Sequence, residues 1–174
     1  CFHEEQLEVI SGVGDSERPF DLIAMVDGEV YTHIRGIGLA KIVGSRLELL
    51  DGLGFDLKTN AYLPHPEGIL IASRYDGLFL YDGERIQPFS SQADELFNKH
   101  HIYQGIILRD GNYAFATLGG GVVIIDSTGQ VIHQIDSKIY KLVNESVNCI
   151  FEDASQGLWL GMPSGLMYVD RKKR

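Results

Sequence analysis

A short polar segment, Arg74-Tyr75-Asp76, lies between two apolar runs and carries the clearest binding chemistry in the sequence. A guanidinium group forms paired hydrogen bonds with a carboxylate or with sugar hydroxyls, and a tyrosine ring stacks on the face of a sugar. The flanking runs predict that this segment is a turn between two strands. We therefore expect Arg74, Tyr75 and Asp76 to contact a small-molecule ligand.

Corresponding turns elsewhere in the chain supply two further candidates. Arg35 lies in an earlier turn, and Met162 begins the turn Met162-Pro163-Ser164 near the end of the sequence. The turn Leu118-Gly119-Gly120 offers backbone groups only. Loops that gather at one end of a fold are common ligand sites, so Arg35 and Met162 complete the expected binding set.

Catalytic, metal and cofactor sites are not expected from the sequence. Metal sites need ligands at short fixed spacing, and the histidines, which include His33, His65, His100, His101 and His133, lack it. No nucleophile elbow, carboxylate pair at a known spacing or Cys/His pair is present. We therefore expect no enzyme activity and no cofactor.

A sequence repeat predicts the strands that hold these turns in place. Gly77, Gly121 and Gly165 stand 44 residues apart, and an aspartate follows each of them after five residues. Four apolar residues lie between the glycine and the aspartate in each copy. A period of this size indicates one structural unit used repeatedly, and each X-Gly pair upstream predicts a tight turn entering a strand.

Apolar runs flank each of these strand pairs. They are residues 21–26, 61–63, 102–108 and 147–151 before the pairs, and 46–50, 85–89 and 130–135 after them. Four short strands per unit predict an all-β fold, a partial β-propeller of about four blades with four antiparallel strands each. A two-sheet sandwich is the alternative, but it would not require glycines at a fixed period. The one helical candidate is Ser91–Asn98, which would bury Leu96 and Phe97.

The repeats divide the chain, residues 1–174, into parts of one propeller. Residues 1–11 are expected to form the outer strand of an incomplete blade, with Leu7–Ile10 as that strand. Blades are expected at 19–52, 57–90 and 102–135, and a blade without its outer strand at 147–170. A four-bladed ring, an eight-bladed pair of chains and a piece of a longer sensor all fit this pattern. Because an open strand edge invites pairing, we expect a homo-oligomer.

The last repeat resembles a known family. Residues 147–170 contain Glu152-Asp153, then Leu158-Trp159-Leu160-Gly161, then Gly165-Leu166 and Tyr168-Val169-Asp170. They resemble the two-component regulator propeller repeat, with one residue fewer between Gly157 and Trp159 and with Met162 in place of threonine. The resemblance is specific for this repeat and supportive for the two before it, about 110 residues in all.

The resemblance implies a role and a location. Such repeats form the periplasmic sensor part of bacterial membrane receptors, ahead of a small β-sandwich, a membrane helix and a histidine kinase or diguanylate cyclase. The ligands in gut relatives are often oligosaccharides. We therefore expect a non-catalytic, ligand-sensing segment that reaches the membrane only through segments absent from this chain.

Composition excludes several other classes. A net charge of -9 disfavours nucleic acid and anionic membranes, which need clustered Lys and Arg. No run approaches the 18 or more apolar residues of a membrane span. Cys149 and Trp159 lie in apolar strands, so we expect a buried free thiol and an indole packed between blades.

Two alternative functions remain at this stage. Propellers of similar repeat length include lyases of the streptogramin lyase type, in which His100, His133 and Glu152 would have to act near a magnesium ion. Their spacing in the sequence gives this no support. A protein-binding scaffold is the other alternative, and exposed apolar patches would mark it.

Overall fold

The computed structural model describes residues 20–50, 57–140 and 146–172, which form fifteen strands and two short helices. The strands make four antiparallel sheets, in each of which neighbours follow one another in the chain. We call these sheets blade 1 to blade 4.

Blade 1 contains β1 (Phe20–Val26), β2 (Glu29–Ile34), β3 (Gly38–Val43) and β4 (Arg46–Leu49). Blade 2 contains β5 (Thr59–His65), β6 (Gly68–Ser73), β7 (Gly77–Tyr81) and β8 (Ile86–Pro88). Blade 3 contains β9 (Ile102–Ile107), β10 (Tyr113–Thr117), β11 (Val122–Ile125) and β12 (Val131–Ile135). Blade 4 contains β13 (Cys149–Glu152), β14 (Leu158–Met162) and β15 (Gly165–Val169). Helices α1 (Asp94–Lys99) and α2 (Ser137–Tyr140) lie in the connections into blades 3 and 4.

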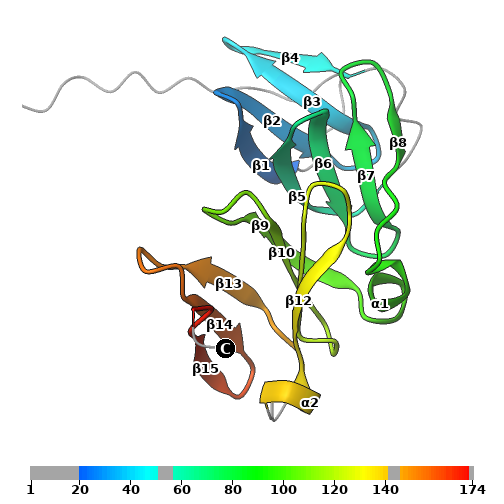
Figure 1. Cartoon of the computed structure of the whole chain (residues 1–174). Coiled ribbons are helices and arrows are strands. Elements are labelled where there is room, and N and C mark those ends of the chain that lie inside the picture. The colour runs from blue at the N-terminus through cyan, green and yellow to red at the C-terminus, as the bar shows by residue number, and fades with distance from the viewer. Residues whose placement is uncertain (1–19, 51–56, 141–145, 173–174) are drawn as a thin grey trace, which may run out of the picture.

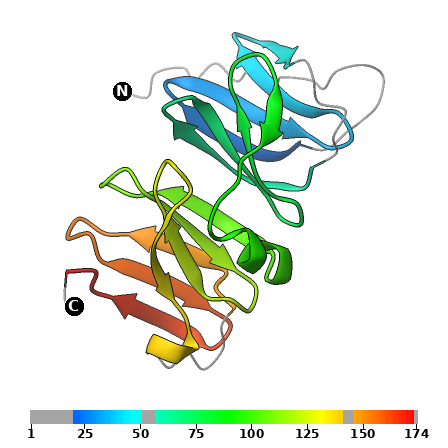
Figure 2. The same cartoon turned by 45° about the vertical axis from the view of Figure 1, so that its right-hand side comes forward.

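The blades stand side by side around an open arc, with blade 1 and blade 4 at its two ends (Figure 1 and Figure 2). Their first strands contact one another in series, β1 with β5, β5 with β9, and β9 with β13. Each pair of neighbouring blades encloses its own apolar cluster, around Tyr62 and Ile71 for the first pair, Phe115 for the second and Leu160 for the third. This arrangement is that of a β-propeller and confirms the predicted fold.

The three repeat glycines hold equivalent places in the fold. Gly77, Gly121 and Gly165 each follow the turn from the second to the third strand of a blade. Their φ angles are 82°, 71° and 140°, in the region that favours glycine. The repeated glycine therefore marks a place in each blade where φ is positive, at the 44-residue period of the sequence.

Helix α1 begins three residues later than predicted. It spans Asp94–Lys99 and buries Phe97, with Leu96 partly buried against the same apolar cluster. The Ser91 hydroxyl accepts from the Ala93 N–H at 3.2 Å, as expected of a residue that caps this turn, and the Ser91 N–H and hydroxyl donate to Asp94 Oδ1 at 3.0 and 2.7 Å. The carboxylate of the first turn therefore organises the residues before the helix.

Two expectations about burial were wrong. The Cys149 side chain is exposed, and Trp159 keeps 38% of its surface open to solvent. Both lie on the face of blade 4 that no other described blade covers. The expected strand Leu7–Ile10, with the whole of residues 1–11, lies outside the described residues.

Arg171, which follows β15, ties blade 4 to blade 3. Its Nη1 donates to Glu152 Oε1 at 3.0 Å, and its Nη2 pairs with Asp110 Oδ2 in the turn between β9 and β10. The other oxygen of Glu152 accepts a hydrogen bond from the Arg109 N–H at 2.7 Å. Two carboxylates from two blades thus share one guanidinium group.

This arrangement predicts a pH dependence of stability. Burial opposes ionisation of Asp110, but hydrogen bonds from Arg171 and the Asn112 N–H outweigh it and lower the pKa of this carboxyl below its ordinary 3.8. Since the folded-state pKa is the lower one, the carboxylate stabilises the fold above pH 3.8 and loses this contribution as the pH falls through the folded-state value.

We expect Asp110→Asn to lower the free energy of unfolding at pH 7 by no more than about 1 kcal/mol, because solvent screens this partly exposed pair. Urea unfolding should show the difference from wild type shrinking from about pH 5 to about pH 2. Arg171→Gln should produce a loss with the same pH dependence. A difference that stays constant over that range would contradict the ion pair as its cause.

Candidate ligand-binding site

The turn between β6 and β7 is held by the backbone of two blades. The Arg74 N–H donates to the Lys58 carbonyl at 2.7 Å, at the entrance to blade 2. The Arg74 carbonyl accepts from the Ile102 N–H, at the start of blade 3, at 3.1 Å. One residue therefore bridges two blades, and its side chain starts from a fixed position.

Four side chains gather around this turn. The Arg74 guanidinium lies 5.5 Å from the centre of the Tyr75 ring and 5.4 Å from that of Tyr103, within cation–π distance of both. His101 meets the Tyr75 ring edge-to-face at 4.9 Å. Tyr75 and Tyr103 are both exposed. We call Arg74, Tyr75, His101 and Tyr103 the Arg74 cluster.

Two buried nitrogens of the cluster have no hydrogen-bond partner among the described residues, Arg74 Nε and His101 Nδ1. Leaving a polar group buried and unpaired costs about 1–3 kcal/mol, so such groups are concentrated where a ligand or water completes the hydrogen bonding. The cluster thus combines exposed aromatic rings, a cation and unpaired polar atoms.

The other predicted residues have different positions. The Asp76 carboxylate accepts from the Ser73 hydroxyl at 2.7 Å and so closes its own turn. Arg35 is exposed in the matching turn of blade 1. Met162, on blade 4, is partly buried against the cluster between blades 3 and 4. The structure therefore joins Arg74 to Tyr75 and places Arg35 and Met162 on other blades.

Sequence reasoning missed His101 and Tyr103 as members of this site. They flank Ile102, which begins β9 and is fully buried. The signal available in the sequence was this pair of aromatic residues at the entrance to a strand. Their distance from Arg74 in the chain concealed the contact, which depends on how blade 3 sits on blade 2.

A polar groove adjoins this region beside α1. It has a volume of about 360 Å³, and its lining includes Glu95, Lys99, His100, Gln134 and Asp136. Of its lining residues, His100 directly precedes His101 of the Arg74 cluster in the chain, and no member of the cluster itself lines the groove. Acidic, basic and amide groups in one groove suit a ligand rich in hydroxyls.

A larger hollow of about 670 Å³ lies at the opposite end of the blades, near Asp110 and Asp126. The carboxylates of Asp110 and Asp126 are already engaged. Asp126 Oδ1 accepts from the Thr128 hydroxyl and N–H and from the Gln130 N–H, and these bonds lower the pKa of Asp126. Asp110 pairs with Arg171. The polar groups here maintain turns and offer less to a ligand.

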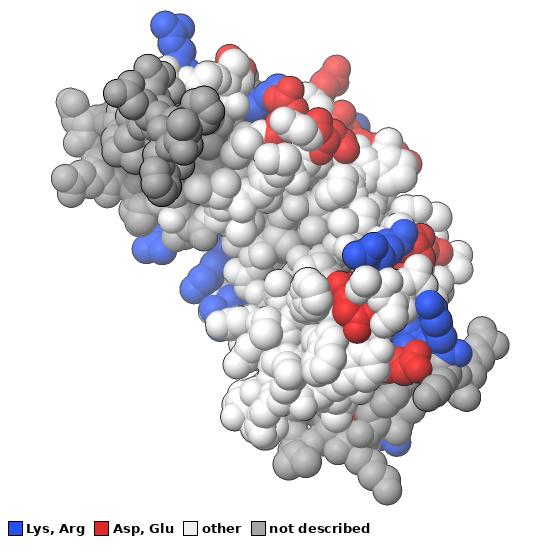
Figure 3. Space-filling model, turned by 90° about the vertical axis from the view of Figure 1, so that its left-hand side faces the viewer, with Lys and Arg blue, Asp and Glu red and all other residues white. Residues whose placement is uncertain are grey.

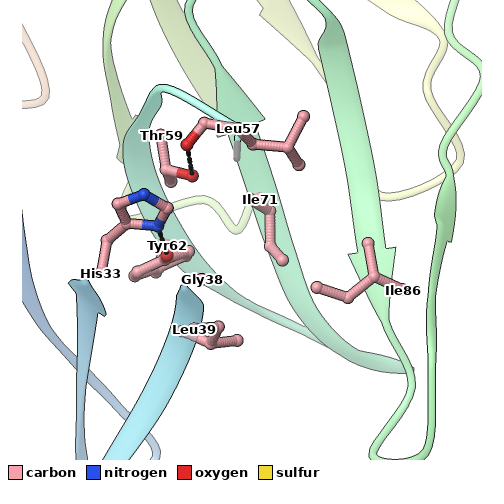
Figure 4. Close-up of a pocket in the computed structure, with 8 residues that line it drawn as sticks. All are labelled: His33, Gly38, Leu39, Leu57, Thr59, Tyr62, Ile71 and Ile86. Carbon is pink, nitrogen blue, oxygen red and sulfur yellow. Dashed lines mark hydrogen bonds between the residues drawn. The ribbon is translucent and has the colours of Figure 1, made fainter. Parts of the chain in front are cut away.

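A small cavity lies between blades 1 and 2 (Figure 4). His33 Nδ1 and the Tyr62 hydroxyl are 3.2 Å apart in it, and the Thr59 hydroxyl donates to the Leu57 carbonyl at 3.4 Å. Burial raises the pKa of Tyr62. The volume of about 10 Å³ is that of one water molecule, so the cavity is too small for an organic ligand.

The residues considered for a lyase lie in separate places. His100 precedes β9, His133 lies on β12, and Glu152 ends β13, where Arg171 engages its carboxylate. The described ranges contain no group of three or more His, Cys, Asp or Glu side chains arranged to hold a metal ion. In the same ranges no helix has the length and apolar character needed to cross a membrane.

Comparison with solved structures identifies proteins of similar fold. The extracellular domain of BT4673 from B. thetaiotaomicron, assigned to a one-component or hybrid two-component system, is 20% identical with a TM-score of 0.65, over 86% of this chain and 21% of that one. The extracellular domain of the hybrid two-component system BT3049 from the same organism is 23% identical with a TM-score of 0.55, over 83% and 19%. This chain thus spans about a fifth of the length of those sensor domains.

A third similar structure is the computationally designed Ika4 protein. It is 11% identical with a TM-score of 0.66, and the match covers 95% of this chain and all of Ika4. No protein-family profile and no curated protein matches the sequence. The comparisons show that the chain has the propeller fold found in extracellular domains of bacterial two-component sensors.

Proposed function

We propose that this chain is a ligand-sensing propeller segment from the extracytoplasmic region of a bacterial signalling receptor of the two-component type. The observation that carries the proposal is the Arg74 cluster, with its paired tyrosine rings and unpaired buried nitrogens. The shared fold with extracellular domains of such receptors supports the location. The segment itself binds and does not catalyse.

The ligand class follows from the chemistry of the site. Tyr75 and Tyr103 are exposed aromatic residues of the kind that stack on sugar rings, and Arg74 supplies charged donors for hydroxyl or carboxylate oxygens. The groove beside α1 carries amide, acidic and basic groups that suit further hydroxyls. We therefore propose a small, hydroxyl-rich molecule, an oligosaccharide in particular, as the ligand.

Removing the Arg74 side chain tests this assignment. In a thermal-shift screen of oligosaccharides, we expect a ligand that raises the melting temperature of the wild-type chain. Arg74→Ala should bind the same ligand at least about tenfold more weakly, because charge-assisted hydrogen bonds contribute about 1.5–3 kcal/mol. Titration calorimetry on the wild type and the variant would measure the change.

Arg85→Ala is the matched control. Arg85 lies on the same blade in the turn before β8, at the opposite end, with a side chain that is 74% exposed. Its replacement should leave binding unchanged. A ligand whose affinity is the same in Arg74→Ala and wild type would refute this site, and a screen without any stabilising sugar would refute the ligand class.

A further inference from the structure

The Arg74 guanidinium group is partly buried and forms no ion pair with a carboxylate of the described residues. The acidic residue nearest to it in the chain, Asp76, accepts with Oδ2 from the Ser73 hydroxyl at 2.7 Å. Two tyrosine rings flank the group, and its Nε is buried without a hydrogen bond. The cluster therefore holds a positive charge that no ion pair within the described residues balances.

Arg171 shows what this chain supplies elsewhere to a guanidinium group that is taken out of water. Its side chain is 16% exposed and contacts two carboxylates, those of Glu152 and Asp110. A charge that loses its hydration needs a partner charge and hydrogen bonds in compensation. Arg74 lacks the partner charge, and its Nε lacks the hydrogen bond. A ligand can supply both.

The shape of the guanidinium group selects the kind of ligand. Nε and the Nη on the same side of the plane donate in parallel, and the two oxygens of a carboxylate accept both hydrogen bonds together. A single sugar hydroxyl offers one oxygen and brings no charge. We propose that the ligand of the Arg74 cluster is an acidic oligosaccharide whose carboxylate pairs with Nε and Nη of Arg74, a proposal that rests on the sensing function proposed above.

A sugar acid also accounts for the second unpaired nitrogen of the cluster. His101 Nδ1 is buried without a hydrogen bond, and its ring meets the Tyr75 ring edge-to-face at 4.9 Å. A hydroxyl both donates and accepts, so it pairs with this nitrogen in either tautomer of the histidine. Sugar acids carry hydroxyls close to the carboxylate. The two unpaired nitrogens therefore match the two kinds of polar group that an acidic sugar offers.

Two lysines lie beside residues of the cluster. Lys58 accepts the Arg74 N–H at its carbonyl, and Lys99 lies two residues before His101. Both lysines are exposed, and neither forms an ion pair with a carboxylate of the described residues. The chain as a whole has 24 acidic and 15 basic side chains, so such a place is unusual in it. Figure 3 likewise shows an uneven spread of charge, with basic groups along its left edge that have no acidic group beside them in that view. These charges favour an anion over a neutral ligand.

The carboxylate reaches Nε by displacing a flanking ring, because this nitrogen is buried. Tyr75 lies in the turn between β6 and β7 with 48% of its surface exposed, and Tyr103 is 39% exposed. Exposed side chains change rotamer within nanoseconds, so such a ring turns aside without disturbing the core. The displaced ring is then available to stack on the sugar that carries the carboxylate.

Matched ligands that differ only in charge test the proposal. Oligosaccharides of galacturonic, glucuronic and mannuronic acid would be titrated into the chain by calorimetry, each beside its methyl ester, which keeps the hydroxyls but loses the charge. At least one acid should bind the wild type about tenfold or more tightly than its ester does. Raising NaCl from about 20 mM to about 500 mM should weaken binding of the acid and leave that of the ester unchanged.

Substitutions of Arg74 separate its charge from its geometry. Arg74→Gln should lower the affinity for that acid by about tenfold or more and remove most of its advantage over the ester. Arg74→Lys keeps the charge without the parallel donors, so it should bind the acid more weakly than the wild type and keep the salt dependence. Arg85→Gln removes a charge from a 74% exposed side chain at the opposite end of the blade, and as the matched control it should bind the acid like the wild type. Circular dichroism would establish that each variant is folded, and the comparison of acid with ester on the wild type decides the proposal even if one is not.

Equal affinities of every acid and its ester for the wild type would overturn the carboxylate, and an equal loss of both in Arg74→Gln would then leave the site itself standing. Wild-type affinity in Arg74→Lys would contradict the paired hydrogen bonds. A sulfated oligosaccharide that binds more tightly than every uronate would assign the site to a sulfate group and overturn the proposal. Absence of binding by all three acids at about 1 mM would overturn it too, whereas the sensing function fails only if the wider screen yields no sugar.

Discussion

Gly121→Ala is expected to lower the free energy of unfolding by at least about 4 kcal/mol, a very large effect for one methyl group. Gly121 has a φ of +71°, where an L side chain is strained, and a Cβ at this position would overlap the carbonyl oxygen of Ile135. That oxygen belongs to the backbone at the end of β12, so it cannot rotate away. Urea denaturation followed by circular dichroism would measure the loss.

Gly77→Ala is the matched control, because Gly77 holds the same repeat position in blade 2. Its φ is +82°, but no heavy atom lies within 4 Å of the place a Cβ would occupy. Gly77→Ala should lower the free energy of unfolding by only about 1 kcal/mol, from backbone strain alone. Equal losses at the two glycines would show that the contact with Ile135 contributes nothing and that backbone conformation decides both.

Phe115→Ala is expected to cost about 3–5 kcal/mol, the usual range for deleting a fully buried phenylalanine ring. Phe115 lies on β10 in the cluster between blades 2 and 3, and its ring meets that of Phe97 on α1 edge-to-face at 5.5 Å. The substitution would therefore leave a cavity where two blades and a helix meet. Equilibrium unfolding in urea is again the measurement.

Ile132→Ala gives the comparison within blade 3. Ile132 is an exposed residue on the outer strand β12, and its truncation should change the free energy of unfolding by less than about 0.5 kcal/mol. A loss below about 1 kcal/mol for Phe115→Ala would mean that blades 2 and 3 collapse onto the missing ring, so that the cluster tolerates volume change.

The fold was accessible from the sequence because its unit is short and repeated. Gly77, Gly121 and Gly165 all have positive φ at equivalent places in their blades, and the apolar runs around them became strands with nearly the expected bounds. Local patterns also located the helix that buries Phe97. These are properties of a segment and its nearest neighbours in the chain.

The candidate site was accessible only in part. Arg74 and Tyr75 are adjacent, so their turn revealed both, but His101 and Tyr103 reach them from another blade. The side-chain rotamer of Asp76 decides whether its carboxylate accepts from the Ser73 hydroxyl, as it does here, or faces a ligand. Such contacts arise from packing between units, about which a repeat period carries no information.

The exposure of Cys149 and Trp159 has a related cause. Their strands are apolar because the repeat prepares both faces of every sheet for burial. Whether a given face is covered depends on the blade beside it. The sequence pattern therefore predicted the apolar character of this face of blade 4 correctly, but the prediction that Cys149 and Trp159 are buried was wrong.

The backbone of Arg74 connects the proposed ligand site to two blades. Its N–H donates to the Lys58 carbonyl and its carbonyl accepts from the Ile102 N–H, so the residue joins blade 2 to blade 3 through its backbone. A ligand that contacts the guanidinium group, as proposed above, would therefore bind to a residue whose backbone is hydrogen-bonded to both blades. If a ligand binds at the Arg74 cluster as proposed, we expect it to influence how blade 2 packs against blade 3.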